Sequence, residues 1–91
     1  MKEVIVHSFE THCNNMDYTN IKVYLEHFPF LATYDESIYF INICDEGNLE
    51  LIKLFVQHGA DPNCSDYPLW TCKYNRFYDC LEYLEGLVKK S

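Results

Sequence analysis

The chain has 91 residues, of which 48% are hydrophobic and 16% aromatic. This composition is too apolar for a disordered segment and predicts a single folded domain. Fourteen acidic residues against seven basic ones give a formal charge of −7, which disfavours direct binding to nucleic acid or to an anionic membrane surface. A basic protein is the complementary partner, although acidity also serves solubility alone.

The N-terminal segment and the cysteines bear on the compartment. The apolar run at residues 4–6 is too short for a secretion signal, and no stretch reaches the eighteen apolar residues of a membrane-spanning helix. Five cysteines is an odd number. Without a secretion signal, this predicts a cytoplasmic protein whose thiols are all free and mostly buried as small hydrophobic groups.

The first third of the chain predicts two helices. Residues 3–13 are followed by a polar break at Asn14 and Asn15, and a second helical segment covers residues 17–27. Asp17 and Thr19 are both candidate N-caps for that second helix.

The middle third contains the clearest helix. Residues 49, 52, 55 and 56 place apolar side chains on one face of a helix over 48–58. Asn48 suits its N-cap, Gly59 suits the left-handed position after its end, and Pro62 prevents continuation. The preceding segment, 37–46, is a strand by propensity alone. A short helix is the preferred alternative, because the same layout recurs along the chain.

The last third repeats this layout. Residues 67–74 form a short apolar segment with Pro68 at a helix start, then comes a break at residues 75–76, and a longer amphipathic helix follows over 77–88. Equivalent positions Tyr24, Phe55 and Leu84 are 31 and 29 residues apart.

Self-similarity at this period is typical of a helical solenoid. We therefore predict an all-α fold with six helices in three antiparallel pairs and almost no β-structure. The expected domain is 1–91, with repeats at approximately 1–33, 34–63 and 64–91. The core is expected to centre on the middle pair, with the outer pairs packed on either side. Its predicted members are Leu49, Ile52, Phe55, Val56, Phe40, Ile43, Leu81, Leu84, Leu69, Cys72, Ile21, Tyr24, Leu25 and Val6.

One stretch of the middle third resembles a known family. Residues 46–63 read EGNLELIKLFVQHGADPN, which is similar to the second helix and loop of an ankyrin repeat, G-H-L-E-x-V-x-x-L-L-x-x-G-A-D-x-N. In the third repeat, residues 67–70 (YPLW) stand where the family has T-P-L-H. The chain departs from the family at 38–41, where that signature is absent. Asn42 and Thr71 also replace the usual aliphatic residues, and the loop before the third repeat is shorter.

The resemblance implies a protein-binding function without catalysis. Ankyrin repeats usually contact partners through the loop before the first helix of each pair and through the exposed end of that helix. Trp70, the only tryptophan, is either an interface anchor or an aromatic cap on the last repeat. Transferred to this chain, these positions and Trp70 give the predicted partner-binding set. Its members are Tyr34, Asp35, Ser37, Asp45, Glu46, Ser65, Asp66, Trp70, Tyr74 and Asn75.

We expect the four carboxylates of this set, with Tyr34 and Tyr74, to form one contiguous patch that steers a basic partner. Reversing the charges of Asp45 and Glu46 is expected to change stability by under about 0.5 kcal/mol, as at other exposed sites. Because three repeats can block a surface unaided, a sharper hypothesis is a small inhibitor, like the immunity and phage counter-defence proteins that neutralise toxins. The alternatives are an adaptor or fragment of a longer ankyrin protein, or a Cys/His metal-binding protein.

Patterns for metal or catalytic chemistry are weak. Cys64, Cys72 and Cys80 are eight residues apart rather than in tight pairs, and the only close pair is His12 with Cys13. No cysteine lies in a nucleophile signature, and no glycine-rich phosphate loop occurs. The sequence therefore predicts no enzyme activity, no metal and no cofactor.

Overall fold

A computed structural model describes residues 1–89, and these residues contain helices and no strand. The all-α prediction is confirmed, and the ambiguous segment at 37–46 is helical. The six α-helices and one short 3-10 helix, η1, are α1 Lys2–Asn14, α2 Tyr18–His27, η1 Pro29–Ala32, α3 Tyr34–Glu46, α4 Leu49–Gln57, α5 Tyr67–Tyr74 and α6 Tyr78–Lys89.

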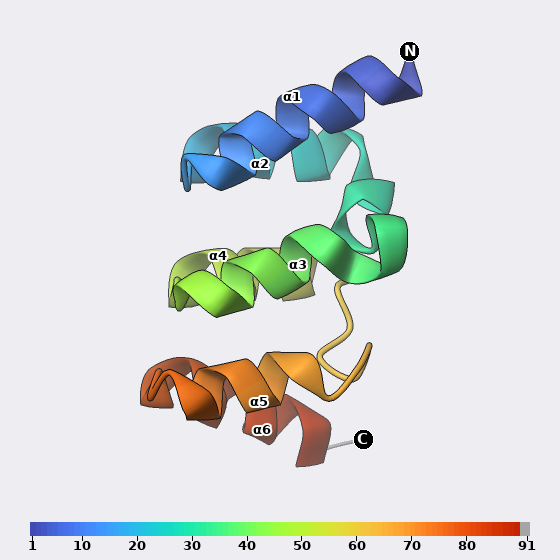
Figure 1. Cartoon of the computed structure of the whole chain (residues 1–91). Helices are drawn as coiled ribbons and strands as arrows, with labels where there is room; N and C mark the ends of the chain where they lie inside the picture. Colours follow the sequence, from blue (N-terminus) through green and yellow to red (C-terminus); the bar gives the residue numbers. More distant parts are fainter. Residues whose placement is uncertain (90–91) are drawn as a thin grey trace.

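The helices form three antiparallel pairs that stack in chain order (Figure 1). The first helices of the pairs, α1, α3 and α5, pack on one another in one column, and α2, α4 and α6 form a second column behind it. The Cα radius of gyration is 12.4 Å, close to the roughly 12 Å of a compact domain of this length. The division into repeats 1–33, 34–63 and 64–91 stays a prediction.

The turn within each pair has the same backbone conformation. Met16, Gly47 and Arg76 all have positive φ, at 52°, 70° and 62°, and they are 31 and 29 residues apart. At each turn this residue donates its N–H to a carbonyl three residues earlier, at 3.1, 3.1 and 3.2 Å. Glycine is required at Gly47, because a Cβ there would also lie 2.7 Å from the Phe77 ring.

The predicted caps are present on the two best-defined helices. Asn48 accepts a hydrogen bond from the Leu51 N–H at 3.2 Å and so caps α4. Asp17, rather than Thr19, caps α2 by accepting from Asn20, and these bonds hold the pKa of Asp17 below its ordinary value. Gly59 follows α4 with φ +110°, as predicted.

The core lies between the two columns and runs through all three pairs. Phe40, Ile43, Ile52 and Phe55 are fully buried, as predicted. Six predicted core residues pack against it only partly buried, namely Val6, Tyr24, Leu49, Val56, Leu69 and Leu81. The single-face interpretation of residues 48–58 omitted Leu51 and Leu54, which are also buried. α4 contacts α2, α3 and α6, so its buried surface is wider than one helical face.

The connection between α2 and α3 is more ordered than a simple loop. Leu31 and Ala32 of η1 are fully buried. The three residues at 35–37 then have positive φ values of 52°, 55° and 66°, so the right-handed part of α3 begins at Ile38. A left-handed conformation at three consecutive non-glycine residues is costly for L-amino acids, and no pattern in the sequence indicates it.

Candidate functional site

Three aromatic side chains form a row on α5, which we call the aromatic ladder: Tyr67, Trp70 and Tyr74. Their spacing of three and four residues places them on one face of the helix. Their side chains are 38%, 52% and 71% exposed. The Tyr67 and Trp70 ring centroids are 5.6 Å apart, and Trp70 stacks on Tyr74 at 5.0 Å with an interplanar angle of 16°. The ladder is therefore an ordered aromatic surface that faces solvent.

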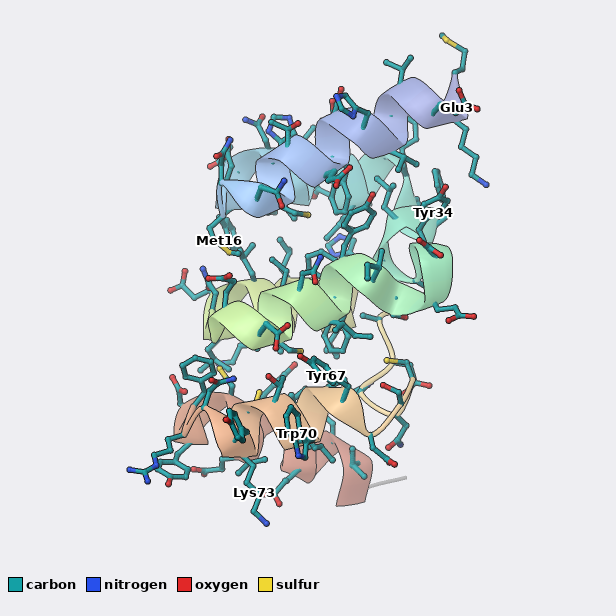
Figure 2. All side chains as sticks on the ribbon, viewed as in Figure 1. Glu3, Met16, Tyr34, Tyr67, Trp70 and Lys73 are labelled. Carbon is teal, nitrogen blue, oxygen red and sulfur yellow. The ribbon has the colours of Figure 1, made fainter. Side chains whose placement is uncertain are left out.

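The first member of the ladder is anchored to the neighbouring pair. The Tyr67 hydroxyl donates to the two Asp45 carboxylate oxygens at 2.9 and 3.1 Å, and Figure 2 shows the ring lying between α3 and α5. The hydrogen bond to Asp45 raises the pKa of the Tyr67 hydroxyl. Because one end of the ladder is held in this way, Tyr67 keeps a fixed orientation relative to α3.

Asp45 also accepts a hydrogen bond from Thr71 Oγ1 at 2.5 Å. The Thr71 side chain, only 1% exposed, accepts in turn from Asn75 Nδ2 at 3.0 Å, while the same amide donates to the Thr71 carbonyl at 2.9 Å. We call Asp45, Tyr67, Thr71 and Asn75 the interlayer network. It supplies the partners that a buried hydroxyl requires.

The interlayer network corrects the expectation that Asp45 is a free surface charge. Both carboxylate oxygens of Asp45 are used within the chain, so this residue holds α3 to α5. Asn75 is exposed, but its side-chain amide is likewise engaged with Thr71. Sequence reasoning placed neither Tyr67 nor Thr71 in the site. The aromatic spacing 67, 70, 74 and the polar Thr71 at an expected aliphatic position were the available signals.

Ser37, a member of the predicted binding set, is buried. It is only 4% exposed and lies within the left-handed turn at 35–37. Tyr34 is also engaged within the chain, since its half-buried ring stacks on Tyr39 at 6.3 Å and contacts Phe30 edge-on at 6.1 Å. The Lys2 ammonium lies 5.4 Å from the Tyr34 ring centroid.

The remaining members lie toward the two ends of α3 and α5. Asp35 and Asp66 are exposed near the starts of α3 and α5, and Glu46 and Tyr74 are exposed near their ends. With a rise of 1.5 Å per residue, the two ends of α3 are more than about 10 Å apart. Trp70 lies between these ends, on the near face of α5, whereas Lys73 extends beyond the end of the stack (Figure 2). On this face Trp70 is 52% exposed.

Comparison with family models, curated proteins and solved structures found no match for this chain. The interpretation of the site therefore rests on its geometry. Within residues 1–89, no helix is both long and apolar enough to span a bilayer.

The cysteines are unpaired and mostly inaccessible. Cys13, Cys44, Cys72 and Cys80 are buried, and Cys64 is exposed. Burial raises the pKa of Cys13 and of Cys80 to about 12, and it raises the pKa of Cys44 and Cys72 as well. Such thiols are poor nucleophiles at neutral pH. No group of three or more His, Cys, Asp or Glu able to hold a metal ion occurs in the described part of the chain.

Proposed function

We propose that this chain is a short ankyrin-type protein that binds a basic protein partner through the exposed face of α3 and α5, without catalysis. The observation that carries the proposal is the aromatic ladder. Three ordered aromatic rings in a row on an exposed face are unusual for a surface that has no binding role, because the hydrophobic effect favours covering them.

The chemistry of the ladder suits a protein interface. Tyrosine and tryptophan supply large contact areas with few rotatable bonds, and they dominate the energetics of many interfaces. Trp70 is held between two rings, and Tyr67 is held by Asp45. Less side-chain entropy is therefore lost when a partner binds than for a free surface aromatic.

The charge around the ladder favours a cationic partner. Glu46 and Asp66 are exposed on either side of Trp70, and the chain carries a formal charge of −7. Exposed carboxylates increase the rate of association with a cationic protein, and a lysine or arginine side chain can bind over the Tyr74 ring, which is 71% exposed. Lys73 points away from this face, toward the end of the stack (Figure 2).

The proposed role is that of a small inhibitor in the cytoplasm, where five thiols remain reduced. To cover a functional surface of a toxin or nuclease, this chain needs only the exposed face of α3 and α5. An adaptor, or a segment of a longer repeat protein, would use the same face, so the identity and fate of the captured partner distinguish these roles.

Affinity capture from the source cell tests the proposal, with Trp70→Ala/Tyr74→Ala as the disrupted bait. Tyr78→Ala is the matched control, because Tyr78 is 63% exposed but lies on α6. We expect wild type and the control to capture a basic protein whose affinity falls with added salt. The double variant should bind that protein at least tenfold more weakly. Equal capture by all three baits would contradict the proposal.

A further inference from the structure

A second surface lies on the other column of helices. Two adjoining hollows of about 480 and 360 Å³ run between α4 and α6, and Leu87 lines both. We call them together the α4–α6 groove. The aromatic ladder is on α5, in the first column, so the two surfaces belong to different sides of the stack.

The floor of the groove is apolar and incompletely covered. Leu49 and Val56 from α4 and Tyr83 and Leu87 from α6 line it, and each is only partly buried. Two nearby helices with partly exposed apolar side chains between them form the kind of surface that accepts the apolar face of a third helix.

Gly86 leaves room in the groove for close approach of another chain. It lies inside α6 and lines the groove, and a Cβ at this position would meet nothing within 4 Å. Glycine is a poor helix former, and alanine would fit here without a clash. The missing side chain serves no packing purpose within the chain, whereas it allows another backbone to approach closely.

The rim of the groove is acidic. Asp61, Asp79 and Glu82 contribute carboxylates, and Lys53 is the one basic lining residue among those described. The Lys53 ammonium lies 5.5 Å from the Tyr83 ring centroid, so it is held against the groove wall. Local backbone bonds engage Oδ1 of Asp61 and Oδ1 of Asp79.

We propose that the α4–α6 groove binds an amphipathic helix of a partner protein, with apolar side chains on its buried face and lysine or arginine along its flanks. The apolar floor accepts the apolar side chains of that helix, and Gly86 permits close approach of its backbone. The acidic rim pairs with its lysine or arginine side chains. α6 has 12 residues, so about three turns of a partner helix fit along it.

A designed peptide tests this proposal directly. The probe is a labelled, tryptophan-free, helix-forming peptide of about four turns, with leucine at helical spacing and lysine on both flanks. We expect saturable binding to the wild-type chain, with backbone NMR shifts at Lys53, Tyr83 and Gly86. Emission from Trp70, the only tryptophan, should stay unchanged. A scrambled peptide and one with glutamate flanks should bind at least tenfold more weakly.

Gly86→Ala separates binding from stability. This variant should melt at a higher temperature than wild type, because alanine favours the helix, yet bind the peptide at least tenfold more weakly. Glu85→Ala, an exposed neighbour outside the groove lining, should bind normally, and Glu82→Lys should weaken binding. The proposal is overturned if the scrambled peptide binds equally, if the lysine peptide does not bind, or if binding alters Trp70 emission instead.

Discussion

At the scale of single residues, Asp45 shows why a charge pattern alone does not define a surface. In the sequence it belongs to an acidic set with Glu46, and nothing local separates the two residues. In the structure Asp45 accepts hydrogen bonds from two hydroxyl groups across the α3–α5 contact, whereas Glu46 is exposed. Which of two adjacent carboxylates faces the next pair depends on helix orientation, which requires the tertiary structure.

This difference gives a paired prediction on stability. Asp45→Lys should lower the free energy of unfolding by about 1–3 kcal/mol, because it leaves the buried Thr71 hydroxyl without its acceptor. Glu46→Lys should change it by under about 0.5 kcal/mol. Urea unfolding followed by circular dichroism measures both. If the two variants are equally stable, Asp45 does not hold the pairs together in solution.

At the scale of elements, the sequence predicts best where the signals are local. The caps at Asp17 and Asn48 and the spacing of Tyr24, Phe55 and Leu84 come from short-range patterns, and the helices they define are present. The burial of Leu51 and Leu54 on α4 depends on neighbouring pairs, and the left-handed turn at 35–37 follows the buried residues of η1. No local sequence pattern indicates either the wide burial of α4 or this turn. The aromatic ladder was indicated by a local pattern, the spacing of Tyr67, Trp70 and Tyr74.

The central position of α4 makes Phe55 a sensitive test of the register. Its ring is fully buried and contacts Phe9 of α1 and Phe40 of α3, with centroids 6.0 and 6.2 Å away. Phe55→Ala should cost about 3–5 kcal/mol, a large fraction of the stability of so small a domain. Gln57→Ala, at an exposed position of α4, is the control. A Phe55→Ala melting temperature close to wild type would show that the helix is placed wrongly.

At the scale of the whole molecule, the buried thiols predict how stability responds to pH. An unfolded cysteine ionises near pH 8.5, whereas burial raises the pKa of Cys13 and Cys80 to about 12. Above pH 8.5 the unfolded chain therefore releases protons that the folded chain retains. The stabilisation is complete below about pH 8.5 and is lost progressively as pH rises toward 12.

Urea titrations from pH 7 to pH 10.5 check this expectation. The free energy of unfolding should be nearly level up to about pH 8.5 and then decline. Cys13→Ala should have lower stability throughout but a shallower decline, because one of the titrating thiols is gone. Denatured, unreduced protein should also react as five free thiols. If the free energy of unfolding of Cys13→Ala declines as steeply as that of wild type, titrating groups other than the Cys13 thiol cause the decline.

The stacking of pairs in chain order also has a kinetic consequence. Each pair packs mainly on the pair that directly precedes or follows it, so few contacts require the closure of long loops. Domains with such local topology have low contact order and fold on the microsecond-to-millisecond scale. The middle pair is the natural nucleus, because it alone offers a packing surface to both neighbours. Refolding is therefore expected to begin at the middle pair and to spread outward to the first and third pairs.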